Sequence, residues 1–224
     1  MTLNPLDDAI KRELDEHLRE IETTLHADAM AIVSPILPGL DLRVRAAVEA
    51  KTNKNGALVI ILDTPGGIVE VVERMVLTVR HYYPNEVIFV IPNRAMSAGT
   101  IFVMSGDRIF MDHFSCLGPI DPQIEKEGRL LPALSYLNQF ERLNTKAGVG
   151  QLTSAEYALL SKLDLAELHQ FEQARDLSIE LLKGWLSKYK FKNWTVTETQ
   201  HTQVTPQMRE QRAADIAELL NKNE

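Results

Sequence analysis

Two turns rich in small residues constrain this chain more than any other feature, because each directly follows a run of branched apolar residues. The first run, residues 58–62, precedes Asp-Thr-Pro-Gly-Gly at 63–67, and the second, residues 87–91, leads to Ala-Met-Ser-Ala-Gly-Thr at 95–100. Continuous apolar runs of this length are typical of buried parallel strands. Since neighbouring parallel strands end at the same edge of a sheet, the sequence predicts that the two turns lie side by side.

The rest of the chain predicts an α/β fold. Expected strands at 30–33, 57–62, 85–91 and 108–111 alternate with expected helices at 41–50, 68–82 and 97–104. This rhythm is typical of a parallel sheet with helices on its faces. An amphipathic helix at 6–24 precedes it, and helices at 132–147, 153–190 and 206–221 follow, with a short strand at 195–197. We therefore expect an N-terminal helix (1–25), a core (26–150) and a helical extension (151–224) that serves as an oligomerisation arm.

Composition narrows the class of protein. The net charge of −7 comes without any basic stripe, which argues against a nucleic-acid partner. The single Cys116 excludes an intramolecular disulfide and a multi-cysteine zinc site, and we expect neither a metal nor a cofactor. No apolar run approaches the ~20 residues of a membrane span, and the acidic N-terminus lacks the layout of a secretory signal. We expect a cytoplasmic protein without a transmembrane segment, while peripheral membrane association stays open.

Ser97 is the candidate nucleophile. It follows a strand and opens a helix, where unpaired backbone N–H groups favour negative charge. Taken alone, its hexapeptide favours a simple N-cap, because serine is a preferred residue at that position. The neighbouring Pro-Gly-Gly turn favours the nucleophile over the simple N-cap, since two glycines let the backbone approach a substrate carbonyl closely. A serine hydroxyl beside exposed amides provides the nucleophile and the oxyanion hole of an acyl-transfer site.

Three motifs together resemble a known family. Residues 63–67, residues 95–100 and Leu-Gly-Pro-Ile-Asp-Pro-Gln at 117–123 are similar to the Clp-fold serine proteinases misnamed serine dehydrogenase proteinases. These are relatives of signal peptide peptidase A and, more distantly, of the Clp protease proteolytic subunit. The resemblance covers roughly residues 25–220 and implies a ClpP/crotonase-like fold of stacked ββα units with a C-terminal helical extension. It also implies a serine peptidase with an acyl-enzyme on Ser97 and an oxyanion hole made by the N–H groups of Gly67 and Ala98.

The general base is less directly indicated. In the Clp pattern a histidine would fall near residues 120–122, where Asp121 stands instead, so a Clp-type triad is not supported. Signal peptide peptidase A relatives use a serine–lysine dyad, and by that resemblance Lys146 is the leading candidate. Burial would lower its pKa and leave a neutral amine, although a lysine at a helix end also stabilises the helix dipole. The other candidates are Lys126, Lys162, His113 and His169.

Residues 118–122 form the predicted substrate edge. Each proline of Gly-Pro-Ile-Asp-Pro keeps its predecessor out of helical geometry, so the segment is expected to be extended. Such a segment offers a strand with which a peptide substrate can pair, or it simply turns the chain out of the core. The expected substrate contacts are Gly66, Ile68, Ile120 and Asp121.

The combined hypothesis is a peptidase acting on peptide or protein substrates inside a homo-oligomer that restricts access. Two alternatives stay open, because a fold does not fix a function. One is an inactive scaffold or assembly protein that lost its base. The other is a crotonase-like acyl-CoA enzyme, whose oxyanion hole would need no serine at position 97.

Overall fold

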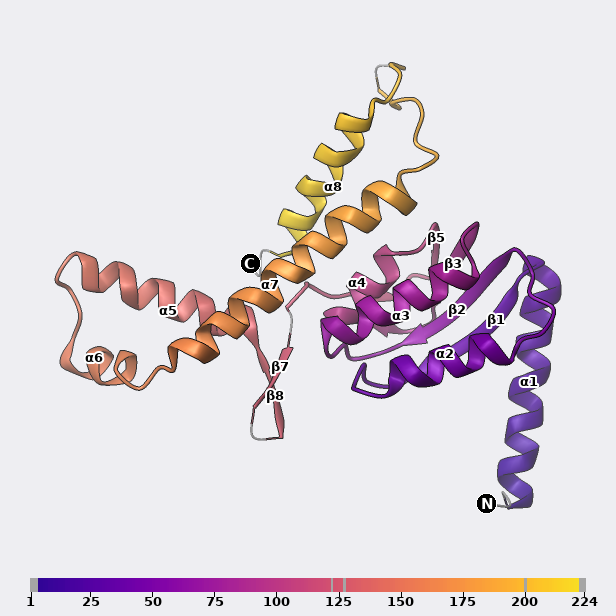
Figure 1. Cartoon of the computed structure of the whole chain (residues 1–224), viewed down its shortest axis with the longest axis horizontal. Helices are drawn as coiled ribbons and strands as arrows, with labels where there is room; N and C mark the ends of the chain where they lie inside the picture. Colours follow the sequence, from indigo (N-terminus) through magenta and orange to yellow (C-terminus); the bar gives the residue numbers. More distant parts are fainter. Residues whose placement is uncertain (1–3, 122, 127, 200, 222–224) are drawn as a thin grey trace.

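A four-stranded parallel sheet in the order β1–β2–β3–β5 forms the centre of the protein (Figure 1). The computed structural model describes residues 4–121, 123–126, 128–199 and 201–221. The strands are β1 (Asp28–Val33), β2 (Ala57–Asp63), β3 (Glu86–Ile91) and β5 (Arg108–Met111). Met30, Ile60 and Phe89 stand side by side across β1, β2 and β3. The predicted α/β class and parallel sheet are therefore confirmed.

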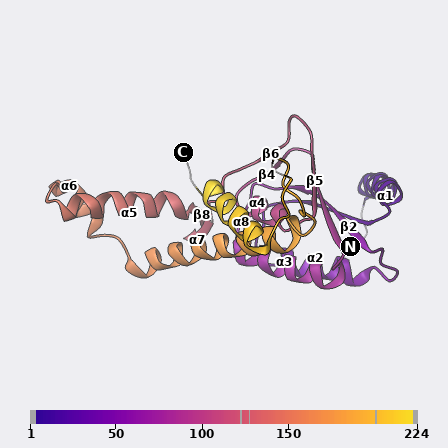
Figure 2. The ribbon, with the colours of Figure 1, turned by 90° about the horizontal axis from the view of Figure 1, so that it is seen from above.

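Helices α2 (Leu40–Ala50) and α3 (Val69–Tyr82) cover one face of the sheet (Figure 2). Side chains alternate across a strand, so every second residue of β2 points at these helices. Leu58, Ile60 and Leu62 are at most 1% exposed and share one core cluster with the valines of α3. This face therefore carries the larger of the two core clusters that lie on the sheet.

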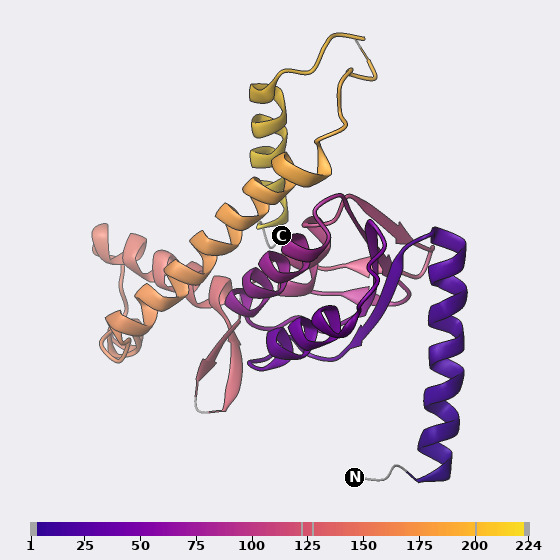
Figure 3. The same cartoon turned by 45° about the vertical axis from the view of Figure 1, so that its right-hand side comes forward.

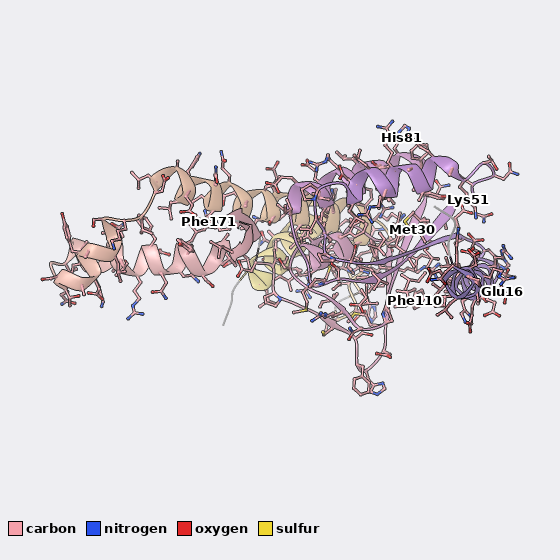
Figure 4. The ribbon with its side chains drawn as sticks, turned by 90° about the horizontal axis from the view of Figure 1, so that it is seen from below. Glu16, Met30, Lys51, His81, Phe110 and Phe171 are labelled. Atoms are coloured by element: carbon pink, nitrogen blue, oxygen red, sulfur yellow. The ribbon has the colours of Figure 1, made fainter. Side chains whose placement is uncertain are left out.

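The opposite face of the sheet is covered less completely. Phe110 lies on this face, across the sheet from His81 of α3 (Figure 4). Helix α1 (Pro5–Leu25) stands beside the sheet (Figure 3), and its last turns pack Ile21 and Leu25 against this second face. The apolar side chains at its other end, Leu6, Ile10 and Leu14, remain 47–67% exposed.

The chain beyond β3 builds the edge where the site lies. Strand β4 (Arg94–Ala95) pairs in parallel with β6 (Cys116–Leu117), and helix α4 (Ala98–Met104) begins directly after Ser97. Strands β7 (Gln123–Lys126) and β8 (Arg129–Pro132) then form an antiparallel hairpin that the sequence analysis did not predict.

The remaining helices form the extension. They are α5 (Ala133–Gly148), α6 (Ser154–Leu160), α7 (Leu165–Trp185), the π-helical turn η1 (Leu186–Lys190) and α8 (Pro206–Leu220). Tyr136 of α5 stacks on Phe171 of α7 with ring centroids 4.8 Å apart. Leu182, Trp185 and Ala213 join the main core cluster, so α7 and α8 pack onto the body of the fold. The boundaries at 25/26 and 150/151 stay predictions.

Residues 153–190 are mostly helical, as expected, but residues 161–164 interrupt the helix, and the Asp164 side chain accepts from the Ala166 N–H (2.8 Å) where the next helix starts. The strand expected at 195–197 is a single bridge between Val196 and Gln203. Within the part of the chain that the structure describes, no helix is both long enough and apolar enough to cross a membrane.

Candidate active site

The two predicted turns meet at the carboxyl edge of the sheet. The Thr64 N–H donates to the Arg94 carbonyl (3.0 Å), and the Met96 N–H donates to the Thr64 carbonyl (3.1 Å). A Cβ added at Gly66 would lie 2.9 Å from the Ser97 Cβ. Only glycine allows this approach, so the first turn abuts the candidate nucleophile as the sequence predicts.

Backbone pairing orients the Gly67 N–H toward the Ser97 side of the turn. On the β1 side, the Ile36 N–H donates to the Gly66 carbonyl and the Ile68 N–H donates to the Ile36 carbonyl, both at 2.9 Å. The Gly66 carbonyl and the Gly67 N–H belong to one planar trans peptide, so they point in opposite directions. The Gly67 N–H therefore faces the side on which β4 and Ser97 lie. Among the described residues it has no hydrogen-bond partner.

Ser97 has a strained backbone conformation. Its φ of 51° and ψ of −119° lie in a region that residues other than glycine rarely adopt. The bridge between Thr64 and Ala95 and the helix that starts at Ala98 hold it there. Strain of this kind is typical of a nucleophile placed on a sharp strand-to-helix turn.

Ser97 occupies the N-cap position of α4, but its side chain makes no capping hydrogen bond. The residue is 6% exposed, and its hydroxyl donates instead to the Asp121 carbonyl. The Ala98 N–H, in the first turn of α4, has no partner among the described residues. The Ser97 hydroxyl and the Ala98 amide thus belong to the second turn, and the Gly67 amide belongs to the first turn, which abuts Ser97 at Gly66.

Residues 118–121, here called the covering segment, lie against this turn. The Thr100 hydroxyl is within hydrogen-bond distance of the Ala95 carbonyl (2.8 Å) and the Gly118 carbonyl (2.9 Å). The Ile120 N–H donates to the Leu220 carbonyl at the end of α8 (3.0 Å). The covering segment is therefore held by α4 on one side and by α8 on the other.

The expected substrate contacts have definite places in this arrangement. Ile120 is 1% exposed, and its N–H is occupied, so in this conformation it offers no edge to a peptide. The Asp121 carboxylate accepts from the Leu134 N–H (3.0 Å) in the first turn of α5. Gly66 lies against Ser97, and Ile68 packs against the main core.

Lys146 lies away from Ser97 in this chain. Helix α5 runs outward from the body of the fold, away from α4, and Lys146 belongs to its last turn (Figure 1). The Lys146 ammonium pairs with the Glu156 carboxylate of α6 at 2.5 Å. The hydrogen bond from Lys146, together with those from the Thr153 amide and hydroxyl, lowers the pKa of Glu156 to about 2. In this conformation Lys146 joins α5 to α6.

None of the other candidate bases contacts Ser97 through its described atoms. His113 lies in an exposed turn against the Phe114 ring (4.7 Å), and His169 lies on the surface of α7 beside Glu172 (3.6 Å). Lys162 follows α6 in an exposed turn. Lys126 belongs to β7, where its backbone pairs with Arg129, and its side chain lies outside the described part of the structure.

Sequence reasoning missed two buried threonines at the site. Thr64 and Thr100 are both 0% exposed, and each bonds to backbone groups of the turns that surround Ser97. The signal for Thr64 was present, since a hydroxyl residue two positions before a glycine in a turn favours a local side-chain hydrogen bond. The described residues contain no group of three or more His, Cys, Asp or Glu side chains arranged to hold a metal ion.

Comparison with known proteins gives a family match. The family model described as ClpP-like SDH-type serine proteinase matches residues 42–223. The chain is also similar to two uncharacterized proteins of Methanocaldococcus jannaschii, MJ1495 and MJ0137, at 28% identity over 142 and 151 residues respectively.

These two matches cover 58% and 61% of this chain, and 46% and 49% of the relatives. The chain thus spans about half the length of the curated relatives it matches. Among solved structures, it is similar to a mutant of the 1510-N membrane-bound stomatin-specific protease, with 18% identity and a TM-score of 0.40. That match covers 64% of this chain and 82% of the other.

Proposed function

Because this chain belongs to the ClpP-like SDH-type serine proteinases, we propose that it hydrolyses peptide bonds through an acyl-enzyme on Ser97. One observation carries the proposal: the strained Ser97 lies where two backbone amides without partners among the described residues, those of Gly67 and Ala98, are gathered. Unpaired donors beside a hydroxyl are arranged to stabilise developing negative charge.

The chemistry follows from these groups. The Ser97 Oγ attacks the scissile carbonyl carbon, and the resulting oxyanion accepts from the Gly67 and Ala98 N–H groups. The C–N bond then breaks, the leaving amine takes the proton that the base removed from Ser97, and an ester remains on Oγ. Water, deprotonated by the same base, attacks this ester, releases the new carboxylate and restores the serine.

The covering segment must shift before this reaction starts. In the present conformation the Ser97 proton points at the Asp121 carbonyl, which cannot act as a base. We propose that an extended peptide replaces this contact and that a neutral lysine then accepts the proton. Restricted movement of the covering segment would therefore keep the peptidase idle in the absence of substrate.

Two lysines compete for the role of base in this proposal. Lys146 needs a rearrangement of α5, or a second copy of the chain, to reach Ser97, because it pairs with Glu156 in the extension. Lys126 belongs to β7, which follows the covering segment directly. A serine–lysine dyad predicts that only one of the two is needed for reaction at Ser97.

The test is covalent labelling by a fluorophosphonate probe. The wild type is expected to be labelled and Ser97→Ala to be unlabelled, while Ser178→Ala, which removes a buried hydroxyl from α7, should label normally. Lys146→Met and Lys126→Met then identify the base, because the variant that has lost the base is not labelled. Failure of the wild type to label from neutral to alkaline pH would favour the inactive scaffold, and tight coenzyme A binding would favour the crotonase-like enzyme.

We further propose a cytoplasmic homo-oligomer that acts on peptide or protein substrates. The exposed apolar side chains of α1 (Leu6, Ile10 and Leu14) support an association surface, because contiguous apolar stripes are uncommon on monomers. Light scattering on the full chain is expected to give a mass of two or more chains of 25.3 kDa each. A monomer at all concentrations would remove this part of the proposal.

A further inference from the structure

Thr64 is a fully buried polar residue that the proposed reaction does not use. Its N–H donates to the Arg94 carbonyl, and its carbonyl accepts from the Met96 N–H just after β4. Its hydroxyl accepts from the Gly66 N–H at 3.1 Å, across the first bend of the turn. Thr64 therefore holds the residue that directly precedes the Gly67 amide.

The hydroxyl removes a freedom that glycine would otherwise have. Gly66 has a φ of +99° and no side chain to restrict its rotation. Its N–H is held by Thr64 and its carbonyl by the Ile36 N–H (2.9 Å), so both peptide groups that flank it are fixed. Because a peptide group is planar, fixing the Gly66 carbonyl also fixes the direction of the Gly67 N–H.

The methyl group of the same side chain contacts the other half of the site. A Cβ added at Gly99 would lie 2.4 Å from the Thr64 Cγ2, so this methyl lies directly against the start of α4. Gly99 follows Ala98, the second amide of the proposed oxyanion hole. One threonine thus touches both turns: its hydroxyl bonds to the first and its methyl packs on the second.

We infer that Thr64 is a positioning residue that sets the direction of the Gly67 N–H and its distance from the Ala98 N–H. The inference rests on the proposed function, because it assigns these two amides to one oxyanion. It does not involve the base. The hydroxyl, which serine keeps and valine lacks, accounts for most of this positioning, and the methyl group adds packing against the start of α4.

The test measures the rate of fluorophosphonate labelling in the full chain. In this reaction a bond forms between the Ser97 Oγ and phosphorus, fluoride leaves, and the phosphoryl oxygen occupies the oxyanion position. Thr64→Val is expected to lower the maximal labelling rate about 10- to 100-fold, since one well-aimed donor contributes on the order of 100-fold or more. Thr64→Ser should restore the rate to within a few fold, and the apparent pKa of the pH–rate profile should not move.

The matched control is Ser178→Ala, which removes another buried hydroxyl, bonded to the Ala174 carbonyl at 2.7 Å, and should label like the wild type. If Thr64→Val labels at the wild-type rate, or if valine and serine are equally slow, the inference is overturned while the proposed function stands. An unlabelled wild type overturns both. Should Thr64→Val lose its cooperative unfolding transition, Thr64→Cys replaces it. Its labelling rate is expected to lie below that of Thr64→Ser and above one tenth of the wild-type rate, and a rate equal to that of the wild type would count against the inference.

Discussion

The two edges of the central sheet are built in opposite ways. At the carboxyl edge, Ser97 is strained and two amides lack partners among the described residues. At the amino edge, the buried Asp107 pairs with Arg80 (2.8 Å) and Lys192 (2.5 Å) and accepts from the Val87 N–H (2.7 Å). The fold thus pairs its buried charges at one edge, although the Arg80 Nε has no hydrogen-bond partner among the described residues. At the other edge it leaves two amides without partners in the described part of the chain, where the proposed chemistry needs them.

The amino edge also anchors the C-terminal extension. The Arg80 guanidinium lies 3.8 Å from the centroid of the Tyr189 ring, and Lys192 comes from the chain just beyond η1. Burial alone would raise the pKa of Asp107, but hydrogen bonds from Lys192, the Val87 amide and Arg80 outweigh it and hold the pKa below its ordinary value. This edge is therefore expected to govern stability and the carboxyl edge to govern activity.

Asp107→Ala should produce the largest loss of stability. It leaves the buried Arg80 without its carboxylate, and breaking a buried pair in this way typically costs about 3–5 kcal/mol. Urea unfolding measures the loss, and the labelling rate of the folded fraction should stay at the wild-type value. A loss of stability below about 1 kcal/mol would mean that the network contributes no more than an exposed pair.

Gly66→Ala should affect both quantities but activity more. The added Cβ would lie 2.6 Å from the Met96 carbonyl oxygen and 2.9 Å from the Ser97 Cβ, at a φ of +99°. We expect a destabilisation of about 1–3 kcal/mol and, because Ser97 is displaced, roughly a 100-fold slower labelling rate. Gly148→Ala is the matched control, since a Cβ there meets nothing within 4 Å. Equal labelling of the two variants would contradict the close approach of the turns.

Acidification should weaken the amino edge. The pKa of Asp107 is lowered in the folded state, so its contribution to stability is complete above the unfolded pKa, near 4, and is lost as the pH falls through the folded pKa. Urea midpoints of the wild type should therefore fall below about pH 4 more steeply than those of Asp107→Asn. Parallel pH dependences would show that other carboxylates govern acid unfolding.

Ser97→Gly should give the smallest change, and it should be a gain. Glycine adopts a φ of 51° without the strain that a serine or alanine suffers, so Ser97→Gly is expected to be about 1 kcal/mol more stable than Ser97→Ala. Thermal unfolding of the two unlabelled variants measures this difference. Equal stabilities would place the strain elsewhere in the turn.

The sequence predicts the parts of the site that local chemistry determines. Branched apolar runs specify β2 and β3, and small residues after them can only form tight turns, so the meeting of Gly66 with Ser97 follows from parallel pairing. The capping box that starts α6 is likewise local, because Thr153 and Glu156 stand three residues apart in the sequence.

Contacts between residues that are far apart in the sequence could not be predicted in the same way. Nothing near Ser97 in the sequence indicates that its hydroxyl donates to Asp121, because the contact depends on how β6 and the covering segment fold back. The sequence analysis did not predict the β7–β8 hairpin, because apolar and polar residues alternate little on either side of its turn at Gly128. Lys146 was expected from the resemblance, and the sequence does not indicate that α5 carries it outward from the body of the fold.

The bond from the Ile120 amide to the Leu220 carbonyl has a consequence for biosynthesis. Translation delivers Ser97 and its glycine turns long before Leu220 emerges from the ribosome. Until then the covering segment lacks its contact with α8, so the arrangement around Ser97 is completed only after α8 has been synthesised.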